Sequence, residues 1–249
     1  MRISEDQFAS LQTFSRERFE TELADWLRVN RAAYVDDLTP SQLNRVAKAV
    51  CARCDALELF GEDATRAFGS AATVYGVYSE TDPLFEDIYY ATLPRAGARI
   101  PHKAAGIWDG LVKVLDAEFS TRSGIELMNS LEQAFCGDSY PDLPAMEVLQ
   151  TYFPERFARL TPSQIKAHLA HSDYQAKRLG LEQPMALRFH RDVGLLLGAY
   201  FSIDPLYPWA QKAFAHAGDD MAKISRLRTA LTHIVRQTQT PSAGEPSCA

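Results

Sequence analysis

The chain has little cysteine, no long hydrophobic run and fewer basic than acidic residues. Its four cysteines among 249 residues follow no disulfide spacing, so we expect free thiols in a reducing compartment; they are Cys51, Cys54, Cys136 and Cys248. The longest apolar run, residues 193–201, falls well short of the roughly 20 residues that a membrane span requires. The polar N-terminus (MRISEDQ) does not resemble a secretory signal, which predicts a cytoplasmic protein without a membrane span.

The deficit of basic charge also limits the kinds of partner. Lysine and arginine number 26 against 32 aspartates and glutamates, which gives a net charge of −6. A nucleic-acid-binding protein usually carries a basic patch or stripe, so we expect no nucleic-acid partner. The acidic balance maintains solubility and, to a smaller extent, favours a basic protein partner.

Recognised catalytic motifs are missing as well. The sequence contains no G-x-S-x-G, P-loop or dinucleotide fingerprint. Cys51 and Cys54 form a C-x-x-C pair, but it lies within a predicted helix and has no second pair with which to bind zinc. We therefore predict no catalytic residues, no cofactor and no metal site. An enzyme stays open as the alternative, with an active site assembled from dispersed residues between two halves of the chain, such as His168, His171 and Glu182.

A repeat is the strongest positive signal. The segment LTPSQL at residues 38–43 returns as LTPSQI at residues 160–165, an offset of 122 residues. At the same offset, DPLF at 82–85 returns as DPLY at 204–207. Two clusters at one offset predict an internal duplication.

Helix-start signals accompany both clusters. Thr39 and Thr161 are each followed by proline, and by glutamine three residues later, which is the pattern of a capping box. Asp82 and Asp204 also precede proline and are expected to start helices, the second of which would run from residue 205 to 217.

Apolar residues recur at helical spacing through most of the chain, and no stretch alternates with the period of a β-strand. We predict an all-α fold of two multi-helix units packed with a helical middle segment. The expected domains are a first repeat unit (1–92), a helical connector (93–144), a second repeat unit with a C-terminal helix (145–237) and a disordered tail (238–249).

Aromatic residues gather around the two Asp-Pro pairs. Most of them suit a helical core, but Tyr207 and Trp209 belong to the residue types enriched in binding hot spots. The first half has Glu86 and Asp87 where the second has Pro208 and Trp209. We therefore predict a partner-binding surface at Tyr207 and Trp209.

A resemblance follows from three stretches of the second half: Phe153-Pro154-Glu155 through Leu160, the run into Leu179-Gly180-Leu181, and Gly198-x-Tyr200-x-x-x-Asp204-Pro205-x-x-Pro208-Trp209-Ala210. They resemble a family of small all-helical bacterial proteins encoded near type VI secretion effectors and other polymorphic toxins. The chain is similar to a tandem version of that family, although its first half lacks the Pro-Trp. The resemblance implies a non-enzymatic protein-binding module, an adaptor, accessory or immunity partner of a secreted effector, and it implies no catalytic residues.

Overall fold

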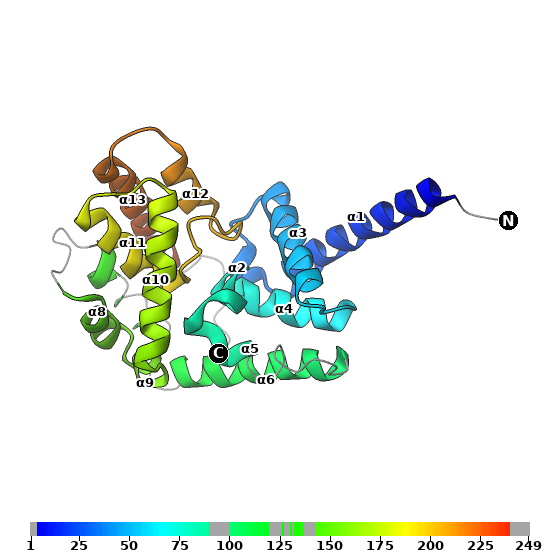
Figure 1. The fold of residues 1–249 in the computed structure, drawn as a ribbon, viewed down its shortest axis with the longest axis horizontal. Helices are drawn as coiled ribbons and strands as arrows, with labels where there is room; N and C mark the ends of the chain where they lie inside the picture. Colours follow the sequence, from blue (N-terminus) through cyan, green and yellow to red (C-terminus); the bar gives the residue numbers. More distant parts are fainter. Residues whose placement is uncertain are drawn as a thin grey trace, which may run out of the picture. The chain divides into compact units, whose positions relative to one another are not determined.

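The computed structural model describes residues 4–89, 100–119, 126, 130, 132–136 and 143–239. In these residues the fold is helical, without a strand, which confirms the all-α prediction (Figure 1). No helix in this part of the chain is long and apolar enough to cross a membrane.

The chain divides into two compact units, and the division differs from the expected domains. Unit 1 comprises residues 1–113 together with 203–208, and unit 2 comprises residues 114–202 together with 209–249. The expected boundaries at 92/93 and 144/145 do not coincide with this division, which falls between residues 113 and 114. The expected tail at residue 238 starts too early, since the last helix continues to Gln239; residues 240–249 lie outside the described part.

Unit 1 is built around three helices. They are α1 (Glu5–Asn30), α3 (Pro40–Ala56) and α4 (Glu62–Tyr75), and Figure 1 shows α1 extending past α3 toward the N-terminus. Leu23 and Leu27 of α1 and Val50 of α3 surround Gly69 of α4, and all three side chains are buried. The short helices α2 (Ala32–Val35), η1 (Ser79–Thr81), η2 (Pro83–Phe85) and α5 (Glu86–Tyr89) complete the unit with the first part of α6 (Ile100–Phe119).

Unit 2 begins within α6 and contains the remaining helices. These are η3 (Glu132–Cys136), α8 (Ala145–Tyr152), α9 (Pro154–Arg159), α10 (Pro162–Arg178), α11 (Pro184–Leu197), α12 (Pro208–Ala215) and α13 (Asp220–Gln239). The Glu118 carboxylate of α6 accepts hydrogen bonds from Nε and Nη2 of Arg156, at 2.9 Å each, and one from Arg159 at 3.0 Å. Arg156 also donates to the carbonyl oxygens of Leu195 and Leu196, so one buried guanidinium ties α6 to the end of α11.

Both predicted capping boxes are confirmed. The Thr39 hydroxyl accepts the Gln42 amide hydrogen at 3.3 Å, and the Gln42 side chain accepts the Thr39 amide hydrogen at 2.7 Å. Thr161 and Gln164 form the same pair of bonds at the start of α10. The repeated hexamer therefore codes for the same helix start twice.

The 122-residue offset also relates the bounds of whole helices. It carries α3 onto α10 and α4 onto α11 at both ends. Gly76 and Gly198 terminate α4 and α11 with nearly equal backbone angles, φ 95° and ψ 153° against φ 93° and ψ 152°, a conformation open essentially to glycine alone. We call positions 122 residues apart matched positions. Such matches are what a duplication would produce, and the common origin of the two halves stays a prediction.

The Asp-Pro pairs behave differently from the prediction. Asp82 caps η2, because its carboxylate accepts the Leu84 amide hydrogen at 3.0 Å. Asp204 accepts the matched Leu206 amide hydrogen at 2.9 Å, but residues 205–207 form a turn and α12 begins only at Pro208. The predicted helix start at Pro205 is therefore wrong. The second oxygen of Asp204 instead accepts the Val77 amide hydrogen at 2.6 Å, which anchors residues 203–208 in unit 1.

Helices α6 and α13 make comparable contacts with the turns that follow α3 and α10, which we call the corners of units 1 and 2. Lys103 of α6 donates to the Glu58 carbonyl oxygen at 3.3 Å, and Lys223 of α13 donates to the Leu179 carbonyl oxygen at 3.0 Å. Each lysine thus binds a carbonyl just beyond the C-terminal end of a helix, α3 or α10, near the negative end of the helix dipole.

Replacing Thr39 or Thr161 with alanine is expected to lower the free energy of unfolding by about 1 kcal/mol each, because each change removes the side-chain acceptor of a helix N-cap. Urea midpoints of the two variants measure the effect. Replacement by serine, which keeps the acceptor, serves as the control. Alanine variants with the midpoint of the parent chain would contradict the role of these caps.

Candidate binding surface

An apolar hollow of about 320 Å³ opens in unit 1 between α1, α3 and the start of α4. Its lining comprises Arg16, Phe19, Cys51, Cys54, Asp55, Leu59, Phe60, Gly61, Glu62 and Thr65. The helix α3 supplies the two thiols, and the turn after α3 supplies Leu59 and Phe60. We call this cavity the apolar hollow.

The two thiols of the hollow are free and buried. Burial raises the pKa of Cys51 to about 11 and that of Cys54 to about 12, so both are neutral near pH 7. A neutral thiol is a poor nucleophile and behaves as a small apolar side chain. Cys51 and Cys54 therefore extend the apolar surface of the hollow.

Charged side chains surround the mouth of the hollow. Arg16 bridges α1 and α3, since it binds Glu20 at 2.7 Å and Asp55 at 2.8 Å. Glu62 pairs with Arg66 at 3.1 Å. Phe60, which also lines the hollow, is 54% exposed.

The turn that carries Phe60 is strongly acidic. Residues 55–63, which we call the acidic corner, contain four carboxylates and no basic residue; the four are Asp55, Glu58, Glu62 and Asp63. All four are exposed. Within the described residues, neither Glu58 nor Asp63 forms an ion pair. The corner therefore exposes two carboxylates without an ion pair beside the hollow, while the Lys103 ammonium binds the Glu58 carbonyl oxygen at 3.3 Å.

Glu58 adopts a backbone conformation that side chains rarely take. Its φ is 54°, and it is the only non-glycine residue of the described part with a positive φ. The matched residue in unit 2 is Gly180, with φ 70°. A left-handed conformation costs a residue other than glycine roughly 1–2 kcal/mol, so the corner carries a carboxylate where glycine would relieve strain.

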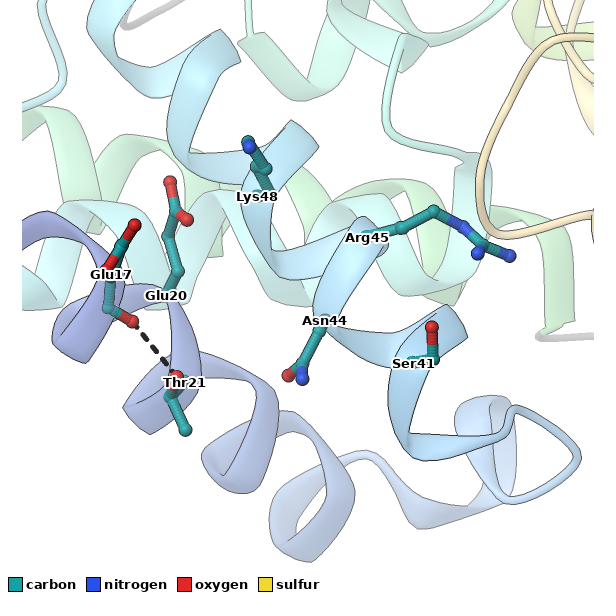
Figure 2. A pocket seen from close by; sticks show the side chains of 7 residues that line it. All are labelled: Glu17, Glu20, Thr21, Ser41, Asn44, Arg45 and Lys48. Atoms are coloured by element: carbon teal, nitrogen blue, oxygen red, sulfur yellow. Dashed lines mark hydrogen bonds between the residues drawn. The ribbon is translucent and has the colours of Figure 1, made fainter.

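A second, polar groove lies farther along the same pair of helices, with a volume of about 500 Å³. Figure 2 shows its lining: Glu17, Glu20 and Thr21 come from α1, and Ser41, Asn44, Arg45 and Lys48 come from α3. Acidic side chains thus face the groove from one helix and basic side chains from the other. The Thr21 hydroxyl is occupied, because it donates to the Glu17 carbonyl oxygen at 3.0 Å. We call this cavity the polar groove.

The predicted partner-binding residues Tyr207 and Trp209 are both half-buried. Tyr207 belongs to unit 1 with the segment that Asp204 anchors, and Trp209 lies in the first turn of α12 and belongs to unit 2. Neither ring is fully enclosed, which is compatible with a contact surface, and their role in binding stays a prediction.

The structure does not bring the three residues of the enzyme alternative into one site. His168 is completely buried in unit 2. His171 is half-buried, and its ring lies edge-on to Tyr200 with 5.9 Å between centroids. Glu182 is exposed in the turn after α10, where its backbone amide donates to Asp220 at 2.6 Å. In the described part of the chain, no three His, Cys, Asp or Glu side chains are grouped as a metal site.

A buried polar cluster occupies the interior of unit 2. The Nδ1 atom of His190 lies 3.1 Å from the Ser172 hydroxyl, and its ring packs against Phe201 and Phe214. Burial, with a smaller contribution from His168, lowers the pKa of His190 to about 3. At the matched positions unit 1 has apolar side chains: Val46 for His168, Val50 for Ser172 and Phe68 for His190. This cluster is closed from solvent and forms part of the core.

Sequence reasoning missed the apolar hollow, since its lining comes from three separate segments. A local signal existed in the acidic corner, where phenylalanine stands directly before glycine and among four acidic residues.

Comparisons with models of known protein families, with curated proteins and with solved structures found no match to this chain.

The stability of unit 2 is expected to fall as the pH drops below about 6.5. The unfolded chain protonates His190 near pH 6.5, whereas the folded chain protonates it only near pH 3, so the unfolded state binds more protons between these values. The loss approaches about 1.4 kcal/mol per pH unit for this one group. Hydrogen exchange of the α10 and α11 amides between pH 7 and 5 measures it.

His190→Phe, which installs the residue of the matched position, is the control and should flatten this dependence. Asp204 in unit 1 has the opposite sign, because burial raises its pKa to about 7 and its contribution grows as the pH falls from 7 toward 4. An equal slope in the parent chain and in His190→Phe would contradict the assignment.

Replacing Glu58 with glycine is expected to raise the free energy of unfolding of unit 1 by about 1 kcal/mol, because glycine adopts the positive φ without strain. Urea unfolding measures the change. The matched substitution Gly180→Glu should destabilise unit 2 by a similar amount. A destabilised Glu58→Gly variant would show that the Glu58 side chain supports the fold.

Proposed function

We propose that this chain is a non-enzymatic, cytoplasmic protein-binding module that acts as an adaptor, an accessory protein or an immunity partner of a secreted bacterial effector. The resemblance to helical proteins encoded near type VI secretion effectors and polymorphic toxins supports this proposal. The proposed partner is a protein, and the net charge of −6 argues against nucleic acid. The proposal includes no cofactor and no metal.

The apolar hollow is the observation that carries the proposal. It lies at the lower end of the roughly 300–1,000 Å³ range of ligand pockets, is lined by aromatic, aliphatic and neutral thiol groups, and opens beside the exposed Phe60. Exposed apolar surface with a polar rim is typical of protein-interaction sites. The polar groove continues along α1 and α3 and offers charged groups of both signs to the same partner.

The test is co-expression of the chain with the product of each neighbouring gene. A stoichiometric complex with a toxin or effector supports the proposal. Suppression of toxicity by that complex indicates an immunity partner, and enhanced delivery of an active effector indicates an adaptor. A chain that stays alone with every neighbouring product contradicts the proposal.

Replacing Trp209 with alanine is expected to weaken capture of the partner by about 2 kcal/mol, or roughly 30-fold, as the loss of an interface anchor does. The dissociation constant measured by calorimetry gives the effect. Trp108→Ala removes another half-buried indole, on α6, and should bind as the parent chain does. Normal binding by Trp209→Ala would assign that residue to the core.

A further inference from the structure

We propose that the acidic corner of unit 1 recognises a basic polypeptide segment, which places one large apolar side chain in the apolar hollow and its lysine or arginine side chains on the surrounding carboxylates. This inference rests on the proposed protein-binding function and specifies the chemistry of the partner. It concerns residues 55–63 and is independent of Tyr207 and Trp209.

The size and lining of the hollow select the apolar part of the ligand. A hollow of about 320 Å³ has room for a large apolar side chain. Phe19 and Leu59 supply apolar contacts, and Phe60 stands at the mouth with more than half of its surface exposed. A leucine or phenylalanine side chain of the partner would cover the exposed ring of Phe60.

The charge of the corner selects the residues that flank this anchor. Asp55 and Glu62 are each paired with an arginine of the chain, whereas Glu58 and Asp63 are exposed and form no ion pair within the described residues. The carboxylates of Glu58 and Asp63 are therefore available to pair with lysine or arginine side chains of a partner. Such rim charges raise the association rate and fix the orientation of a ligand.

The matched corner of unit 2 shows that this chemistry is not required by the helix-turn-helix geometry. Residues 177–185 carry Lys177, Arg178 and Glu182, so their charge is reversed, and they contain no phenylalanine. That corner is also held by α13, because the Asp220 carboxylate accepts the amide hydrogens of Glu182 and Gln183 at 2.6 and 2.7 Å. The acidic corner and residues 177–185 connect matched helices, but they differ in the charged and apolar side chains that they expose.

The conformation of Glu58 supports the same conclusion. A glutamate with φ 54° stands where the matched position has glycine. Strained residues cluster at functional sites, where the side chain has a role that offsets the strain. Retention of a carboxylate at this point is explained if the carboxylate meets a ligand.

Nuclear magnetic resonance titration of the full chain with three synthetic peptides tests the proposal. The first peptide is acetyl-Lys-Lys-Leu-Phe-Lys-Lys-amide. The second replaces every lysine with glutamate, and the third replaces leucine and phenylalanine with serine. We expect the first peptide to shift the amide signals of Leu59, Phe60 and Gly61, with an affinity that falls as salt is added, and the other two to leave these signals in place.

Substitutions in the acidic corner measure how much each side chain contributes to the affinity for the first peptide. Glu58→Gly and Asp63→Asn should each raise the dissociation constant of the first peptide about two- to fivefold, as the loss of an exposed ion pair does. Phe60→Ser should raise it further, since it removes exposed apolar surface without disturbing the core. Asp25→Asn on α1 makes the same charge change at another exposed site of unit 1 and should have no effect.

The outcomes separate this inference from the proposed function. Equal shifts with the glutamate peptide, no shift with the lysine peptide, or normal affinity in Glu58→Gly and Asp63→Asn would each overturn the assigned chemistry. These results would not affect the co-expression test, because a complex with a neighbouring gene product can form whether or not the acidic corner binds a basic segment. Glu58→Gly is the sharpest variant, since it is expected to fold more stably and bind more weakly.

Discussion

The structure of unit 1 depends on one buried carboxylate that comes from the far end of the sequence. Asp204 is 2% exposed and receives the amide hydrogens of Val77 and Leu206, one on each oxygen. An amide of this kind without an acceptor would cost about 1–3 kcal/mol. Because residues 203–208 belong to unit 1, the unit is complete only after most of the chain has been synthesised. Unit 1 is therefore not a continuous stretch of the sequence, and a chain that ends at residue 113 would lack residues 203–208 of this unit.

The sequence predicted local structure well wherever one turn of helix decides it. Thr39 and Thr161 start helices through bonds within four residues, so their capping boxes were readable from the hexamer alone. The helix start predicted at Pro205 is wrong, because the local sequence around Asp204 has the pattern of a helix cap. The sequence does not show that the second carboxylate oxygen of Asp204 accepts the amide hydrogen of Val77, which is 127 residues away. The apolar hollow and the unit boundaries were likewise set by contacts distant in sequence. Composition and periodicity carry little information about such pairings.

Matched positions allow the two interiors to be compared residue by residue. Val46, Val50 and Phe68 fill the interior of unit 1 with apolar groups, whereas unit 2 has His168, Ser172 and His190 there. A buried neutral histidine such as His190 requires hydrogen-bond partners and resists protonation. The stability of unit 2 therefore depends on acid pH through this residue, whereas the apolar side chains at the matched positions of unit 1 do not titrate. The same helix frame thus tolerates two kinds of core, provided that the caps and the terminal glycines are kept.

The two units also differ in the surfaces that they present at matched positions. The corner of unit 2, residues 177–185, is contacted by Asp220 and Lys223 of α13, which satisfy its backbone groups. The corner of unit 1 receives only Lys103 among these contacts and keeps an exposed aromatic ring, an adjoining hollow and a strained glutamate. A corner that is closed by its own chain has its backbone groups satisfied, whereas the corner of unit 1 leaves Phe60 and four carboxylates exposed on the same helix-turn-helix geometry.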